Sequence, residues 1–131
     1  MRELVDRVLT EVDADEQAGP LLRATGMHLR LWLPDLDLAV NIAASEDPDH
    51  YLAWSFEATA PWEPKLELTM RSVMANAYLQ GKTSVPVEIA RGHVQCVGDA
   101  RSALLYLPAT KLITDPYRRL VAAEYRHLLV V

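Results

Sequence analysis

Apolar side chains recur every three or four positions at the start of the chain, which predicts an amphipathic helix over residues 2–13. Its predicted buried face consists of Leu4, Val5, Val8, Leu9 and Val12. Pro20 and Gly26 then bracket a short second helix, because proline suits a first helical turn and glycine suits a helix end. The first fifth of the chain is therefore predicted to be helical.

From Met27 onward the apolar positions alternate with polar ones, which is the pattern of a half-buried strand. Residues 27–33 and 36–42 follow this pattern on either side of a turn at Pro34-Asp35, and residues 50–57 follow it again. Three such segments separated only by turns predict an antiparallel meander with one apolar and one polar face. On the third strand the apolar face holds Leu52, Trp54 and Phe56.

The middle of the chain predicts a short strand over residues 65–68, followed by a helix that Thr69 caps and Gly81 ends. We expect this helix to cover one face of the sheet. Its apolar stripe consists of Met70, Val73, Met74, Ala77 and Tyr78.

The last third predicts a helical turn that Pro86 opens, a fifth strand over residues 93–97, and two helices. Asp99 is expected to cap the first helix, which Pro108 interrupts, while Asp115 and Pro116 open the second. The apolar residues of these helices include Ala103, Leu104, Leu107, Tyr117, Leu120 and Val121. The elements together predict an α/β chain of the α+β type, with a five-stranded sheet and a helical layer on one face.

The span from Leu66 to Leu107 resembles the sterol carrier protein family of the second type, whose members are small lipid-binding domains. The resemblance depends on the strand Leu66-Glu67-Leu68-Thr69, the helix ending in Leu79-Gln80-Gly81-Lys82, the turn from Pro86 to Arg91, and the run Gly92-x-Val94-x-Cys96-x-Gly98-Asp99. The residues before that glycine-bounded strand are smaller than is usual in the family. We therefore expect the fold to be retained and leave the ligand open.

The resemblance implies an apolar tunnel between the sheet and its helices that takes a fatty acyl chain, a sterol or a similar molecule. Flexible methionines beside rigid aromatic rings suit such a ligand, and each buried CH₂ group contributes up to ~0.8 kcal/mol. The predicted ligand-binding residues are Leu52, Trp54, Phe56, Met70, Val73, Met74, Ala77, Tyr78, Leu104, Leu107, Tyr117 and Val121. Trp62, in a proline-containing loop, is the candidate for a lid.

Composition and charge limit the expected binding partners and the expected cellular location. The chain of 131 residues is half apolar and carries a net charge of −5, so one domain over residues 1–131 and no nucleic acid partner are expected. Arg118, Arg119 and Arg126 are interpreted as a solvated helix surface. The single cysteine, Cys96, and the charged first residues favour the cytoplasm, and no apolar run predicts a transmembrane segment.

Candidate catalytic groups are few. The chain contains no nucleophile elbow, no phosphate-binding glycine loop and no His-Glu-x-x-His motif, and His93 with Cys96 is too small a set for zinc. No cofactor, metal or catalytic residue is therefore predicted.

Two alternatives to lipid binding or transfer remain open at this point. One is an accessory enzyme that acts on an apolar substrate in the same pocket, with Tyr78, Tyr117 or His93 as proton donor. The other is an interaction module with a collapsed pocket, which forms a homodimer through the apolar C-terminus, Leu128 to Val131.

Overall fold

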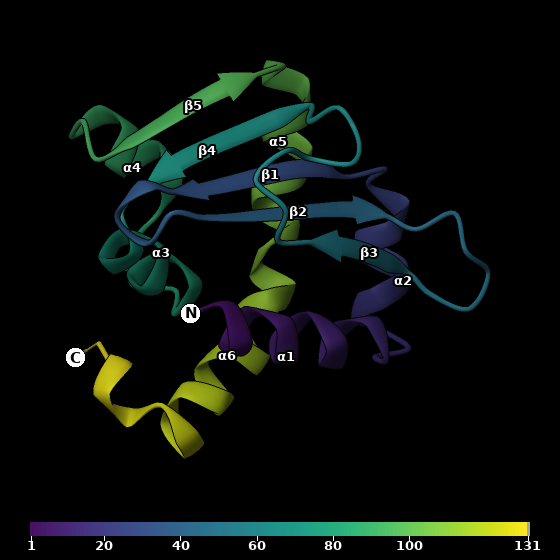
Figure 1. Ribbon diagram of the computed structural model, residues 1–131, viewed down its shortest axis with the longest axis horizontal. Coiled ribbons are helices and arrows are strands. Elements are labelled where there is room, and N and C mark those ends of the chain that lie inside the picture. Colours follow the sequence, from purple (N-terminus) through teal and green to yellow (C-terminus); the bar gives the residue numbers. More distant parts are fainter. Residues whose placement is uncertain (131) are drawn as a thin grey trace.

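The alternating segments form one five-stranded mixed sheet in the computed structural model, which describes residues 1–130 (Figure 1). The strands are β1 (His28–Leu33), β2 (Leu38–Ala44), β3 (Leu52–Ser55), β4 (Leu66–Met70) and β5 (Val94–Gly98). Their order across the sheet is β3-β2-β1-β4-β5, with β1 parallel to β4 and every other pair antiparallel. The predicted sheet and its antiparallel meander are confirmed.

The helices gather on one side of this sheet. They are α1 (Arg2–Asp13), α2 (Ala18–Ala24), α3 (Ser72–Leu79), α4 (Val85–Ala90), α5 (Ala100–Ala109) and α6 (Lys111–Glu124), with 3₁₀ turns η1 (Pro34–Leu36) and η2 (Arg126–Leu128). In Figure 1, α2 and α5 run behind the strands, whereas the connection from β3 to β4 crosses in front of them. The predicted helical layer on one face is therefore confirmed.

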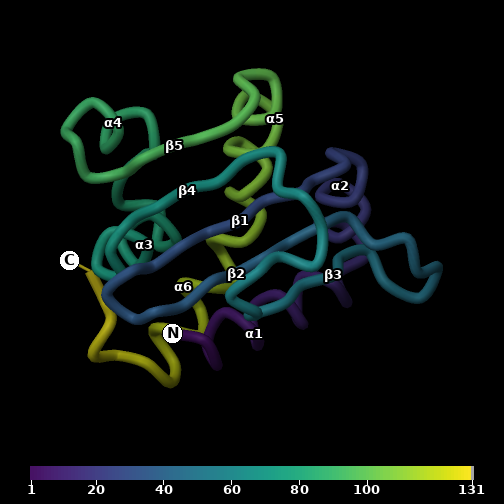
Figure 2. Tube along the Cα trace, turned by 45° about the horizontal axis from the view of Figure 1, so that its top comes forward, coloured from purple at the N-terminus to yellow at the C-terminus, as the bar shows by residue number. Residues whose placement is uncertain are grey.

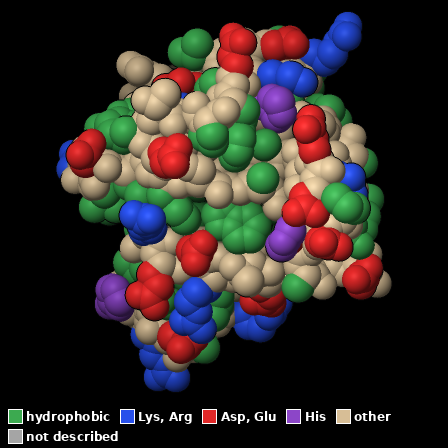
Figure 3. Space-filling view, turned by 45° about the vertical axis from the view of Figure 1, so that its right-hand side comes forward, with side chains coloured by type: hydrophobic (Ala, Val, Ile, Leu, Met, Phe, Trp, Pro, Cys, Tyr) green, Lys and Arg blue, Asp and Glu red, His purple; other side chains and the backbone are tan. Residues whose placement is uncertain are grey.

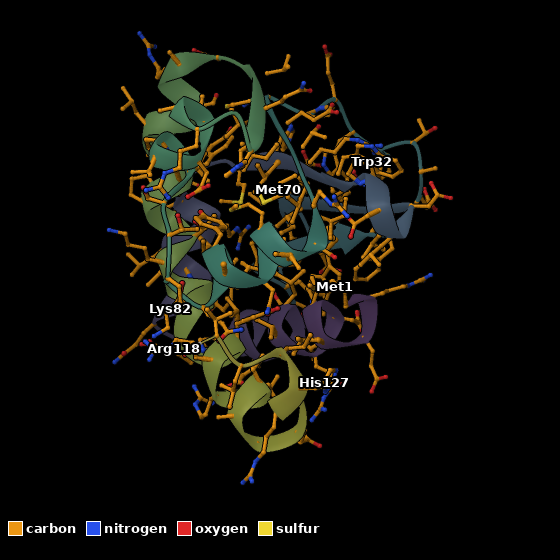
Figure 4. The ribbon with its side chains drawn as sticks, turned by 90° about the vertical axis from the view of Figure 1, so that its left-hand side faces the viewer. Met1, Trp32, Met70, Lys82, Arg118 and His127 are labelled. Atoms are coloured by element: carbon orange, nitrogen blue, oxygen red, sulfur yellow. The ribbon has the colours of Figure 1, made fainter. Side chains whose placement is uncertain are left out.

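The two faces of the sheet differ in polarity as the alternation predicts. Leu29 and Leu33 of β1 face the helices and are buried. On the opposite face, Arg30 donates to Asn41 over 3.2 Å and lies 3.9 Å from Glu67. Figure 4 places Trp32 on this outer side. The hydrophobic core thus lies between the sheet and its helices.

The N-terminus of α3 differs from the prediction. Thr69 and Met70 belong to β4, where Met70 pairs with Val94, so the helix begins only at Ser72. Its cap comes from Asp35 of η1, which accepts from the Ser72 amide over 2.9 Å and from the Ser72 hydroxyl over 2.5 Å. The prediction of Thr69 as cap was wrong because an acceptor distant in sequence satisfies the free amide.

The inward face of α3 is also different from the predicted stripe. Ala75 and Asn76 are its buried residues, while the Val73 side chain is 79% exposed. Asn76 and Gln80 both donate to the carbonyl oxygen of Leu128 over 2.7 Å. The helix therefore turns amide groups inward, because a segment distant in sequence supplies their partners.

Helix α6 follows α5 directly and begins earlier in the sequence than expected. The Asp99 cap is confirmed, since its carboxylate accepts from the Arg101 amide over 2.9 Å. Leu104, however, is 79% exposed, and α6 starts at Lys111 instead of at Pro116. Its buried stripe consists of Ile113, Pro116, Tyr117 and Val121. Burying this stripe outweighs the helical hydrogen bond that Pro116 cannot donate.

The C-terminal segment runs back beside α3, as Figure 2 shows. Leu128 packs against the core, and the Val130 amide donates to Gln80 over 3.1 Å. Over its described part, this segment thus contacts its own chain. Val131 lies outside the described residues, and the homodimer through this end stays a prediction.

Candidate functional site

A cavity of about 480 Å³ lies where the connection from α3 to α4 faces the corner between α5 and α6. This volume is within the usual range for small-molecule sites, ~300–1,000 Å³. It is lined by Tyr78, Gly81, Lys82, Thr83, Ser84, Val85, Pro86, Leu107, Pro108, Thr110, Lys111 and Thr114. The lining is mainly apolar, with hydroxyl groups and two lysines.

The turn after α3 forms one wall of the cavity. The Lys82 amide donates to the Ala77 carbonyl and the Gly81 amide to the Tyr78 carbonyl, each over 2.9 Å, which is a Schellman motif. Gly81 has φ +75°, and a Cβ atom there would lie 3.3 Å from Thr114 of α6. Glycine therefore permits both the turn and the close approach to α6.

Hydroxyl groups connect the two sides of the cavity. The hydroxyls of Tyr78 in α3 and Thr110 at the α5–α6 corner share a hydrogen bond, and Thr110 also donates to the Leu107 carbonyl over 2.7 Å. Burial raises the pKa of Tyr78, against a smaller opposite effect of Thr110. The phenol is therefore neutral at neutral pH, and it offers a polar contact in a cavity wall that is otherwise mainly apolar.

Glu88 anchors the segment that carries the third wall. Its side chain is only 4% exposed, and its two oxygens contact the Thr83 hydroxyl and His93 Nδ1, both over 2.7 Å, and Arg91 over 3.1 Å. Hydrogen bonds from His93 and then Thr83 hold the pKa of Glu88 below its ordinary value. Glu88 thus positions Thr83 at the cavity. Sequence reasoning missed this role, although a lone carboxylate in the run VPVEIA was a usable signal.

The charge around the cavity is positive although the chain is acidic. Lys82 and Lys111 are exposed and line the cavity. Lys82 also lines a neighbouring depression with Asp115, Arg118 and Arg119, and Arg119 is paired with Glu11. Figure 4 shows Lys82 and Arg118 projecting from the same side of the molecule. By contrast, acidic side chains are spread among hydrophobic ones on the face in Figure 3. The cavity therefore has cationic groups at its mouth.

The structure brings only part of the predicted ligand-binding set to this cavity. Tyr78 and Leu107 line it. Leu52, Met70, Tyr117 and Val121 are buried in the core, Met74 and Ala77 are partly buried, and Val73 and Leu104 are exposed. The ligand-binding role of the set stays a prediction.

Aromatic residues expected near the ligand lie elsewhere. Trp54 donates to Asp6 of α1 over 2.9 Å, and the guanidinium of Arg2 lies 4.9 Å from the ring centre of Phe56, so both rings pack against α1. Trp62 lies 6.4 Å from His28, between ring centres, and lines a depression with Arg30. It therefore does not lie over the cavity between α3, α4 and α6.

Sequence reasoning missed most of the lining residues. Lys82 directly follows Gly81, and Lys111 follows Pro108 by three positions, so each lysine comes just after a residue that ends or bends a helix. Of the alternative proton donors, Tyr78 is at the cavity, Tyr117 is buried against Asn76, and His93 is bound to Glu88.

Within residues 1–130, no group of three or more His, Cys, Asp or Glu side chains is arranged to hold a metal ion. None of the helices described here has the length and apolarity required to cross a membrane.

Comparison with known proteins identifies the fold. No family model matches the sequence, and no curated protein matches it either. A conserved hypothetical protein of Thermus thermophilus, described as a possible sterol carrier protein, superposes with a TM-score of 0.63 at 10% identity over 92% of this chain and 87% of its own. Sterol carrier protein 2 from Yarrowia lipolytica gives 0.56 at 11% identity, over 86% and 88% of the two chains.

Two further structures share the fold in other settings. The UbiJ-SCP2 ubiquinone synthesis protein gives a TM-score of 0.59 at 13% identity, over 83% of this chain and 87% of that protein. A stereoselective inverting sec-alkylsulfatase from Pseudomonas sp. gives 0.57 at 13% identity, but this chain corresponds to only 14% of that enzyme's length. The chain has the sterol carrier protein 2 fold.

Proposed function

Taking that fold as the starting point, we propose that residues 1–131 are one cytoplasmic domain that binds an amphipathic ligand with an acyl-type tail and an acidic head. The cavity beside α3 and α6 is the proposed site. The observation that carries the proposal is the combination of an apolar wall from Val85, Pro86 and Leu107 with exposed lysines at 82 and 111.

The tail would be held by burial alone. Each CH₂ group that leaves water contributes up to ~0.8 kcal/mol, so a chain of several carbons binds without a specific polar contact. The lysine ammonium groups would then orient the acidic head toward solvent, and the neutral Tyr78 phenol, whose proton is donated to Thr110, would offer its oxygen as a hydrogen-bond acceptor inside.

Displacement of a fluorescent fatty acid tests this function. Dansylaminoundecanoic acid is expected to bind with an increase in fluorescence, and palmitate is expected to displace it more effectively than methyl palmitate or cholesterol. Native mass spectrometry of the same samples should show one bound fatty acid per chain. Absence of uptake by both methods would exclude the proposal, and stronger displacement by cholesterol would replace the acyl ligand with a sterol.

Tyr78 also supports the second candidate function, an accessory enzyme, because its neutral phenol is a proton donor at the cavity. In that case Tyr78→Phe abolishes turnover of an apolar substrate but leaves its binding intact. A simple carrier would show only a change in affinity.

A further inference from the structure

The two edges of the sheet are treated differently by the rest of the chain. At the β3 edge, the Leu52 amide donates to Asp13 over 3.0 Å, and α1 packs beside the strand. At the other edge, β5 has no neighbouring strand within residues 1–130, although α4 contacts this strand. The backbone at the β3 edge thus has a side-chain partner from within the chain, whereas no described strand lies beside β5 on its outer side.

The open edge presents unpaired backbone groups. The Asp99 amide donates a hydrogen bond to the Lys65 carbonyl. Because β4 and β5 are paired in an antiparallel register, this bond implies that the N–H and C=O groups of residues 95 and 97 point toward β4. Those of Val94, Cys96 and Gly98 point away from the sheet. Apart from the sheet ladder, no backbone group within residues 1–130 hydrogen-bonds these three residues.

The side chains at this edge do not discourage pairing. An exposed edge strand is usually protected by charge, proline or a bulge, but Val94–Gly98 carries no charged residue. Val97 is 69% exposed on the outer face of the sheet. Further exposed apolar residues on the adjoining helices α4 and α5 are Val87, Ile89, Leu104 and Leu105.

We propose that β5 pairs antiparallel with β5 of a second copy, about a two-fold axis at Cys96, so that two sheets join into one. The strand is complementary to itself in this register. Gln95 lies opposite Val97 of the second copy, and His93 at one end lies opposite Asp99 at the other, which brings a basic group to an acidic one. This surface is separate from the C-terminal segment and from the ligand cavity.

Light scattering and sedimentation of the full chain should show a species of twice the 14.7 kDa chain mass, whose fraction rises with concentration. A chain that is monomeric at every concentration would overturn the proposal.

Charge placement tests the register. Gln95→Lys with Val97→Lys puts like charges opposite each other twice and should raise the dimer dissociation constant about tenfold or more. Gln95→Glu with Val97→Lys puts opposite charges there and should restore dimerisation. Val73→Lys, at an equally exposed site on α3, is the matched control and should leave dimerisation unchanged.

Circular dichroism confirms that each variant is folded. If the double-lysine variant dimerises as tightly as the original chain, the β5 interface is wrong and another surface, such as the C-terminal segment, forms the dimer.

Discussion

The Tyr117 hydroxyl donates a hydrogen bond of 2.8 Å to the side-chain oxygen of Asn76, and both side chains are buried between α6 and α3. The same oxygen accepts from Gln80 over 2.8 Å, and both amides donate to the Leu128 carbonyl. A polar cluster of Asn76, Gln80 and Tyr117 therefore connects two helices to the C-terminal segment.

This polar cluster should contribute measurably to stability. Tyr117→Phe removes one donor while Asn76 keeps its bond from Gln80, so the free energy of unfolding should fall by about 1 kcal/mol. Asn76→Ala leaves the buried Tyr117 hydroxyl without its oxygen acceptor, so this substitution should lower the free energy of unfolding by about 1–3 kcal/mol. Urea denaturation measures both. Equal stability of all three proteins would contradict the cluster, and Val73→Ala, at an exposed position on α3, serves as control.

Filling the cavity should block ligand uptake. Leu107→Trp adds bulk to the cavity wall and is expected to lower the affinity for dansylaminoundecanoic acid at least about tenfold, since the tail loses its space. Leu104→Trp, on the exposed side of the same helix, is the control and should bind normally. If Leu104→Trp blocks uptake as well, the ligand lies closer to the site predicted from the sequence than to this cavity.

The lysines should discriminate between charged and neutral ligands. Lys82→Glu combined with Lys111→Glu is expected to weaken palmitate binding about tenfold by charge reversal at the mouth, while methyl palmitate binding stays unchanged. The effect should diminish at high salt because both side chains are exposed. An equal loss for acid and ester would indicate that the substitutions damaged the cavity itself.

Glu88 should make the free energy of unfolding depend on pH in the acidic range. Its pKa is lowered in the folded chain, so its stabilising contribution is complete above the ordinary value of 4.5 and is lost as the pH falls through the folded-state pKa. The midpoint of urea unfolding should therefore fall less on acidification in Glu88→Gln than in the original chain. Identical pH profiles for the two proteins would contradict this assignment.

Strands were predictable because their alternation is a local property of the sequence. The alternation correctly predicts one face of β1, which holds Leu29, Leu31 and Leu33. It assigns the residues between them to the opposite face. The strand order and the parallel pairing of β1 with β4 depend on contacts between distant segments, and neither the alternation nor the resemblance to a family predicted them here.

The candidate site was harder to predict because polar residues of α3 are buried. A helical pattern is read by placing apolar residues inside, yet Asn76 and Gln80 lie inside and Val73 lies outside. Only the hydrogen bonds to Leu128 and Tyr117 explain that choice, and these partners follow 41 to 52 positions later. The cavity depends on the resulting rotation of α3 and on the turn at Gly81.

The amides of Asn76 and Gln80 also affect the order in which the elements pack during synthesis. During synthesis α3 emerges 48 to 52 residues before Leu128, the acceptor that both amides share. Until then, closing the core over α3 would leave those groups dehydrated and unpaired, which is costly. Helix α3 should therefore dock last among the elements around the sheet, and the cavity beside α3 should stay unformed in a nascent chain until Leu128 is in place.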